Sequence, residues 1–254
     1  MRKNKLIYIA AIILSLFLTT SAFADMAIFS DGKFFQSDEQ IFIERVQNYL
    51  NALKNVPEKA SLESKELLLA TKNGNKLWSF TTDFPNSKYA SDARCVIIMN
   101  CFFGALGSKD KKDSEKLIKD MEYLTKRYPN NKFEQVTVGM LKNSPHSLNV
   151  FKYMSMSNTD LLIYFRAMAG LTFNDYESAL KYYLLLKNRI GSIKNLSSLV
   201  ISEIYAGLVI SYDNLGNTSA ELETAKEALS KFPDNAWLKQ HMEKIIQQKS
   251  NHSE

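Results

Sequence analysis

Apolar residues recur at helical rather than alternating spacing along most of the chain after Gln36. The first series consists of Ile41, Ile43, Val46, Tyr49, Leu50 and Leu53, and it ends before Pro57. The same periodicity predicts further helices over about 62–80, 88–107, 113–127, 131–142, 159–173, 175–189, 197–215, 218–231 and 235–249. The pattern contains no convincing alternating strand, and the glycines and prolines fall mostly between these segments. The sequence therefore predicts an all-α fold.

One six-residue pattern recurs at three junctions between predicted helices. The three copies are Phe84-Pro85-Asn86-Ser87-Lys88-Tyr89, Tyr128-Pro129-Asn130-Asn131-Lys132-Phe133 and Phe232-Pro233-Asp234-Asn235-Ala236-Trp237. Proline disfavours the helical conformation in the residue before it, so each aromatic–proline pair should end the preceding helix. The Asn, Asp or Ser that follows the proline can accept a hydrogen bond from an N–H group of the next helix. We therefore predict three helix–turn–helix corners.

The segment that ends at Pro233 has the spacing of a known repeat. Its matching residues are Tyr205, Leu208, Tyr212, Gly216, Ala228 and Pro233. This spacing resembles the tetratricopeptide repeat, a 34-residue helix–turn–helix unit with the pattern W-x2-L-G-x2-Y, a later alanine and a closing proline. Val209 departs from the usual glycine, and Glu221 stands where a small residue is usual. The resemblance implies an α-solenoid of antiparallel helix pairs, a tetratricopeptide-like superhelix.

Other parts of the chain match this pattern more loosely. The segment 161–186 contains Ala167, Tyr176, Ala179 and Tyr183 at suitable positions, with Gly170 where a large residue is usual. The corner around Pro85 is also similar to turns of tetratricopeptide proteins of the bacterial cell envelope. These include the periplasmic partner of the Tol–Pal system and the lipoprotein subunit of the β-barrel assembly machine. The resemblance implies degenerate repeats over 37–249 and a role in outer-membrane assembly or maintenance.

The N-terminal residues have the pattern of an export signal. A basic start is followed by the uncharged stretch Leu6–Leu18 and by small residues at Ala22 and Ala24. Thirteen helical residues rise about 20 Å, less than the ~30 Å of a bilayer core, so cleavage is favoured over a permanent membrane anchor. No cysteine follows the cleavage site for lipid attachment. We expect a signal peptide over 1–24, a periplasmic or secreted mature chain, and no later segment that crosses a membrane.

Two short segments flank the predicted repeat domain. Residues 25–36 contain three phenylalanines around an Asp-Gly turn signal, and they form either an arm that covers the solenoid end or a tail that binds a partner. Residues 250–254 are expected to form a disordered tail.

Charge and cysteine content narrow the class of protein. Loss of Arg2, Lys3 and Lys5 with the signal leaves 29 basic and 27 acidic residues, a balance of +2, and no clustered basic face for nucleic acid.

Cys95 and Cys101 lie on one predicted helix, with Cα atoms about 10 Å apart and ~120° around its axis. A disulfide needs Cα atoms within about 7 Å. We predict two free thiols, both buried.

The reactive residues of the sequence do not form a recognisable catalytic or metal-binding motif. The three histidines His146, His241 and His252 have no metal-ligand spacing, and the chain has no glycine-rich phosphate loop. Ser108 and Lys111 match S-x-x-K, but the partner motifs S-D-N and K-T-G are missing. We predict a non-enzymatic protein without a cofactor or metal.

The remaining hypothesis is a binding surface. The first helix of each tetratricopeptide pair lines a concave groove, and transfer of that pattern selects Phe102, Leu106, Tyr164, Met168, Ile210 and Asp213. Such a groove suits an amphipathic helix or an apolar peptide. The competing interpretation is that these side chains are core. We expect an adaptor or scaffold of the cell envelope; the alternatives are an enzyme or small-ligand protein with a site between repeats, or a subunit of an envelope oligomer. The partner, the pathway and the oligomeric state do not follow from the sequence.

Overall fold

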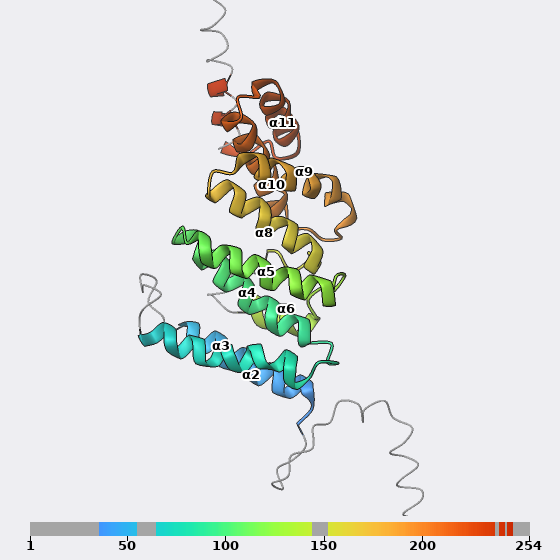
Figure 1. The fold of residues 1–254 in the computed structure, drawn as a ribbon. Coiled ribbons are helices and arrows are strands. Elements are labelled where there is room, and N and C mark those ends of the chain that lie inside the picture. Colours follow the sequence, from blue (N-terminus) through green and yellow to red (C-terminus); the bar gives the residue numbers. More distant parts are fainter. Residues whose placement is uncertain (1–35, 55–64, 144–151, 237–238, 242, 246–254) are drawn as a thin grey trace, which may run out of the picture. The chain divides into compact units, whose positions relative to one another are not determined.

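The fold was analysed in a computed structural model that describes residues 36–54, 65–143, 152–236, 239–241 and 243–245 (Figure 1). The described helices are α2 (Asp38–Lys54), α3 (Lys65–Asp83), α4 (Ala90–Gly107), α5 (Lys111–Arg127), α6 (Gln135–Lys142), α8 (Asn158–Thr172), α9 (Tyr176–Arg189), the 3₁₀ turn η3 (Ile190–Ser192), α10 (Ser198–Asn214) and α11 (Thr218–Lys231). No strand occurs within these ranges, so the all-α prediction is confirmed. The predicted signal peptide, most of the N-terminal arm, Trp237 and the C-terminal tail lie outside the described residues.

The three aromatic–proline corners end helices as predicted. α3 ends at Asp83, α5 at Arg127 and α11 at Lys231, each directly before the aromatic residue. At every corner the N–H of that aromatic residue donates to the carbonyl four residues earlier, over 2.8 Å. The N–H three residues after the aromatic then donates back to the aromatic carbonyl. The six-residue pattern therefore encodes the same backbone turn three times.

The predicted side-chain caps are only partly present at these corners. The Ser87 hydroxyl accepts a hydrogen bond from the Tyr89 N–H at 3.2 Å, as expected for the first corner. At the second corner the prediction is wrong, because α6 begins after Glu134, which makes no side-chain cap bond. The Asn131 amide donates to the Lys132 carbonyl, and the Asn235 amide donates to the Ser202 hydroxyl. The aromatic–proline pair, rather than the cap, is the constant part of the corner.

A second kind of connector also occurs three times, and its conformation was not predicted from the sequence. It joins α4 to α5, α8 to α9 and α10 to α11 through three residues each. The middle residue has a positive φ (57° at Lys109, 62° at Asn174 and 70° at Gly216). The third residue is an Asp or Asn whose side chain caps the next helix. Its own N–H donates to the carbonyl five residues earlier, over 2.8 to 2.9 Å, which satisfies the end of the preceding helix.

This connector accounts for the S-x-x-K match. Ser108 and Lys109 follow the last residue of α4, and Asp110 accepts a hydrogen bond from the Asp113 N–H at 3.0 Å. The Ser108 hydroxyl donates back to the Gly104 carbonyl at 3.1 Å. The four residues therefore form a helix end followed by a helix start.

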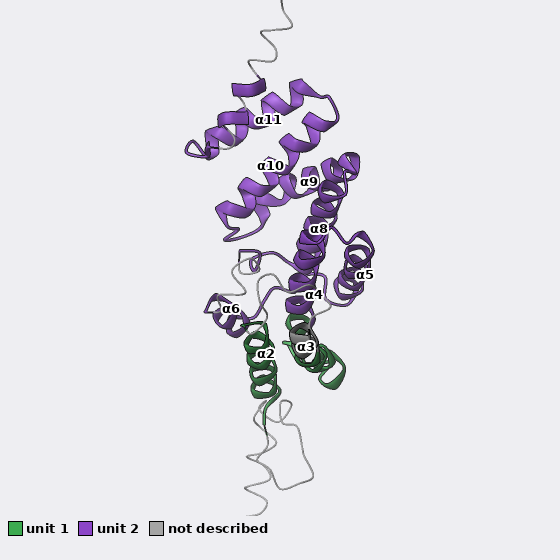
Figure 2. Cartoon of the chain, turned by 90° about the vertical axis from the view of Figure 1, so that its left-hand side faces the viewer, with its two compact units in different colours: residues 1–93 green, residues 94–254 purple. Residues whose placement is uncertain are grey.

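The described chain divides into two units, 1–93 and 94–254 (Figure 2). In the first unit α2 packs against α3, and the ring of Phe42 lies 4.8 Å from that of Tyr89 in a stacked pair and 5.4 Å from that of Phe80 edge-on. The Arg45 guanidinium bonds to the Asp83 carboxylate at 2.7 Å. These contacts hold α2, α3 and the corner residue Tyr89 together within the first unit.

In the second unit α8, α9, α10 and α11 pack in sequence order. α8 contacts α5 and α9, α9 contacts α10, and α10 contacts α11 (Figure 1). The rings of Phe102 and Phe165 stack at 4.0 Å between centroids, and both are fully buried. A further cluster fills the α10–α11 interface with the buried side chains of Tyr205, Val209, Ala225 and Ala228. Short connectors and these apolar contacts make α8–α9 and α10–α11 antiparallel helix hairpins.

Two glycines allow close approach of the helices in this unit. A Cβ atom on Gly170 would lie 2.8 Å from the Ala179 nitrogen and 3.0 Å from the Asp175 carbonyl oxygen, so α8 and α9 touch there through their backbones. A Cβ atom on Gly207 would lie 2.3 Å from the Tyr183 ring. The glycine that seemed unusual in the repeat pattern, Gly170, is therefore required by the crossing of α8 with α9.

Helix α4 corrects two expectations. Both of its cysteines are free, but only Cys95 is buried, and Cys101 is exposed, so the prediction of two buried thiols is wrong. The ~120° between them places the two side chains on different faces of α4. α4 is also long and apolar enough to cross a membrane by length and composition, which the sequence analysis did not expect of any segment beyond the N-terminus. Because 67% of α4 is buried in the structure, these features also fit a core helix.

Candidate functional site

The structure separates the six predicted groove residues into two groups. Phe102, Leu106 and Tyr164 are buried, so these three contribute to the core of the second unit and do not line an open surface. Met168 and Ile210 are partly exposed, and Asp213 is exposed. The part of the predicted groove that remains accessible is therefore concentrated on α10, with Met168 on α8.

The accessible residues of α10 lie along one face of that helix. Leu199, Glu203, Ala206, Ile210 and Asp213 fall within an arc of roughly 80° at 100° per residue, and we refer to them as the α10 stripe. Leu199 is 64% exposed, Asp213 is also exposed, and the other three are partly exposed. The opposite face of α10, with Ile204, Tyr205 and Leu208, is buried. The stripe thus combines apolar side chains with two carboxylates on one partly exposed face of α10.

A network of hydroxyl groups holds one of these carboxylates. Tyr153 and Tyr164 both donate to Glu203 Oε2, at 3.0 and 2.9 Å. The two hydroxyls are 3.0 Å apart, and Lys152 forms an ion pair with Glu203 Oε1. The network joins α8, the turn before it and α10, and it fixes the orientation of Glu203 at the edge of the stripe.

The tyrosines of this network are hydrogen-bond donors at neutral pH. Burial raises the pKa of Tyr153 and of Tyr164 well above the ordinary value, and the Glu203 charge raises both further. Burial also raises the pKa of Tyr183, whose hydroxyl donates to the Met168 sulfur at 3.1 Å. A general base requires a pKa near the working pH. These hydroxyls therefore serve to position Glu203 and Met168 and are poorly suited to accept protons.

A second carboxylate, that of Glu227 on α11, bonds to side chains of α9, α10 and α11. Glu227 bonds to Lys187 at 2.5 Å, to the Tyr205 hydroxyl at 2.6 Å and to Lys231 at 3.1 Å. Desolvation raises the pKa of Glu227, but the hydrogen bonds from these three partners outweigh it and lower the pKa to about 2. Folding therefore stabilises the ionised carboxylate of Glu227, because the pKa of this group is about 2 in the folded chain and has its ordinary value of 4.5 in the unfolded chain.

We expect the stability that Glu227 contributes to be lost in acid. A lowered folded-state pKa stabilises the folded chain above the unfolded value, and the contribution disappears as the pH falls from about 4.5 to about 2. Because the side chain is 36% exposed, solvent limits the effect to about 1 kcal/mol. Urea unfolding of Glu227→Gln should show lower stability than the parent at pH 7 and no difference near pH 2. Glu223→Gln, an exposed glutamate of the same helix, is the control. A difference that stays constant over this range would contradict the assignment.

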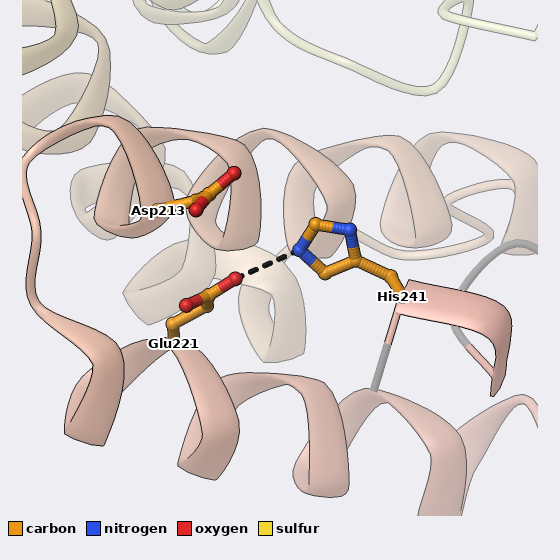
Figure 3. A group of neighbouring side chains, drawn as sticks. All are labelled: Asp213, Glu221 and His241. Atoms are coloured by element: carbon orange, nitrogen blue, oxygen red, sulfur yellow. Dashed lines mark hydrogen bonds and ion pairs between the residues drawn. The ribbon is translucent and has the colours of Figure 1, made fainter. Parts of the chain in front are cut away.

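Three side chains of the second unit come together in a group that could hold a metal ion. Asp213, Glu221 and His241 place one ligand atom each within 4.8 Å of one another (Figure 3). His241 Nε2 lies 2.8 Å from Glu221 Oε1. The spacing of the three histidines in the sequence indicated no metal site, and it could not reveal this group, because its members come from α10, α11 and the helical residues 239–241.

Comparison of the chain with protein-family models, with curated proteins and with solved structures found no match.

Proposed function

We propose that the chain is a protein-interaction adaptor that binds an apolar or amphipathic segment of its partner on the α10 stripe. The observation that carries this proposal is the 64% exposure of Leu199 at one end of a stripe that also contains Ala206 and Ile210. Large apolar side chains on a rigid helix supply most of the binding energy when a partner covers them. α8 and α9 support α10 from one side and α11 supports it from another, so the surface is preorganised.

The charges of the stripe narrow the chemistry of the partner. Glu203 and Asp213 lie at intervals of four and fourteen residues from Leu199 along the same face. Lys152 already pairs with Glu203, and Asp213 makes no ion pair with any residue in the described part of the chain. A partner helix with apolar residues facing Leu199 and Ile210 and with basic residues facing the carboxylates complements the stripe.

The tetratricopeptide-like architecture belongs to the same proposal. Two recurring connectors support it: the three-residue turn inside helix hairpins and the aromatic–proline corner after a hairpin. The match of Tyr205, Leu208 and Tyr212 to the repeat pattern supports it as well. The predicted export signal and the resemblance to envelope proteins lead us to propose a periplasmic or secreted adaptor that acts in outer-membrane assembly or maintenance.

Leucines on neighbouring helices provide a matched test. Leu199→Glu and Leu185→Glu each place a charge at an exposed leucine, 64% exposed on α10 and 43% exposed on α9. Proteins that co-purify with the tagged parent should be lost from Leu199→Glu and retained by Leu185→Glu. With the purified partner, we expect Leu199→Glu to weaken binding about 100-fold, as for loss of an interface hot spot worth ~2.7 kcal/mol.

Three outcomes would contradict this proposal. Equal retention of the partner by both variants would remove the α10 stripe from the interface. Equal loss from both would indicate a different surface or a folding defect, and circular dichroism of the purified variants separates the two. A stable oligomer of the parent that dissociates only in Leu199→Glu, measured by light scattering, would assign the stripe to self-association in place of a partner.

A further inference from the structure

The group of Asp213, Glu221 and His241 has the composition of a transition-metal site. Asp213 lies near the end of α10, Glu221 in the first turn of α11 and His241 at the end of the helical residues 239–241 (Figure 3). Their nearest ligand atoms all fall within 4.8 Å of one another. Glu221 is buried, His241 is partly buried and Asp213 is exposed, so the group has one protected side and one side that faces solvent.

The charges of this group favour a cation. The Glu221 side chain is only 4% exposed, and its ion-pair partner within the described residues is His241. The Glu221 and Asp213 carboxylates lie within 4.8 Å of each other, and no Lys or Arg side chain pairs with either of them in the described chain. A buried carboxylate without a compensating charge is costly, and a divalent ion would balance both negative charges at once.

We propose that Asp213, Glu221 and His241 bind one divalent transition-metal ion, with zinc as the best fit. An imidazole nitrogen among the ligands favours zinc and its neighbours over calcium and magnesium, which prefer oxygen ligands alone. Four-coordinate zinc with bonds of about 2.0 to 2.2 Å needs ligand atoms roughly 3.4 Å apart. The Glu221 and His241 ligand atoms are already closer than this, at 2.8 Å, whereas the three ligand atoms span up to 4.8 Å. Binding of the ion therefore requires mainly a movement of the Asp213 side chain, which is exposed and has room to rotate. The fourth ligand is water on the solvent side.

A bound ion would join three segments of the second unit. The three ligands come from two helices of one hairpin and from the segment after the Phe232-Pro233 corner. An ion held by all three fastens that segment to the α10–α11 hairpin. Because the ligands come together only in the folded chain, zinc should also raise the unfolding temperature. The site goes beyond the proposed adaptor function but shares Asp213 with the α10 stripe, so a bound ion would occupy the carboxylate that otherwise faces a basic residue of the partner.

The test uses zinc alone with the purified full-length chain after removal of metals by a chelator. Every protein carries Cys101→Ser, because that thiol is exposed and thiolates bind zinc. Calorimetric titration should show one zinc ion per chain. Asp213→Asn and His241→Gln should each weaken zinc binding at least tenfold, whereas His252→Gln, a change to a histidine outside the group, should leave it unchanged. Magnesium and calcium should not bind in the same concentration range.

The choice of variants keeps the test independent of folding. Glu221 is buried and its replacement can disturb α11, whereas Asp213 is exposed and its amide variant is isosteric. Zinc should raise the unfolding temperature of the parent and of His252→Gln, but not that of His241→Gln. Absence of zinc binding to the parent would overturn the proposal. So would unchanged zinc binding in both Asp213→Asn and His241→Gln, since the ion would then lie elsewhere, or calcium binding as tight as that of zinc.

Discussion

Phe165→Ala should destabilise the chain by about 4 kcal/mol, the largest effect that we expect from a single substitution. The Phe165 ring is fully buried, stacks on Phe102 at 4.0 Å and meets Phe103 edge-on at 6.1 Å. Its removal leaves a cavity between α4 and α8 and also removes two aromatic contacts, each worth up to about 1 kcal/mol beyond burial. The measurement is the free energy of unfolding in urea, followed by circular dichroism.

Tyr123→Ala is the matched control for this prediction. Tyr123 is an aromatic residue of the same unit, but 53% of its surface is exposed, so its loss should cost less than about 1 kcal/mol. Equal effects of the two substitutions would show that Phe165 is not packed as the structure describes. The same result would reopen Phe102 as a groove residue.

Gly170→Ala should destabilise the chain by about 3 kcal/mol, although the substitution adds only a methyl group. The new Cβ atom would lie 2.8 Å from the Ala179 nitrogen and 3.1 Å from its Cα atom, and these are backbone atoms that cannot rotate away. α9 must therefore move away from α8, and the hydrogen bond from the Asp175 N–H to the Gly170 carbonyl at 2.8 Å is strained. Urea unfolding measures the effect.

Gly104→Ala distinguishes this crowding from the general effect of replacing glycine in a helix. Gly104 is in α4, and a Cβ atom there meets nothing within 4 Å. Its replacement should stabilise the chain by about 0.5 to 1 kcal/mol through helix propensity alone. If Gly170→Ala gave a similar gain, the close crossing of α8 and α9 would be wrong.

The helix ends could be predicted from the sequence because their causes are local. Pro85, Pro129 and Pro233 restrict the residue before them whatever the tertiary structure, and all three helices end there. The connector around Lys109 was predicted in position, between the helices expected over 88–107 and 113–127, but not in conformation. Its left-handed residue is lysine rather than glycine, so the residue type does not indicate the positive φ.

The faces of the helices were harder to predict than their ends. α4 is apolar around almost its whole circumference, so periodicity could not show that Phe102 faces Phe165 or that Cys101 faces outward. Transfer of the repeat pattern selected Ile210 and Asp213 on α10, which are accessible, as well as Phe102 on α4, which is buried. α10 is as apolar on average as α4, so the hydrophobic pattern of neither helix separates its buried face from its exposed face. That a partner binds the accessible residues stays a prediction.

The candidate metal ligands could not be found from the sequence for a different reason. His241 is twenty residues after Glu221, and the turn at Phe232-Pro233 between them brings the two side chains to 2.8 Å. Metal motifs are recognisable in a sequence when two ligands share one helix turn or one loop. Here each ligand comes from a separate helical segment.

Site-specific photo-crosslinking in producing cells tests the proposed binding surface most directly. A photoreactive phenylalanine derivative at Ile210 on the α10 stripe is compared with the same residue at Leu185 on α9. The adaptor proposal predicts a discrete protein adduct from position 210, its loss when Leu199→Glu is added, and no such adduct from position 185. Adducts of equal yield from both positions, or no adduct from position 210, would contradict it.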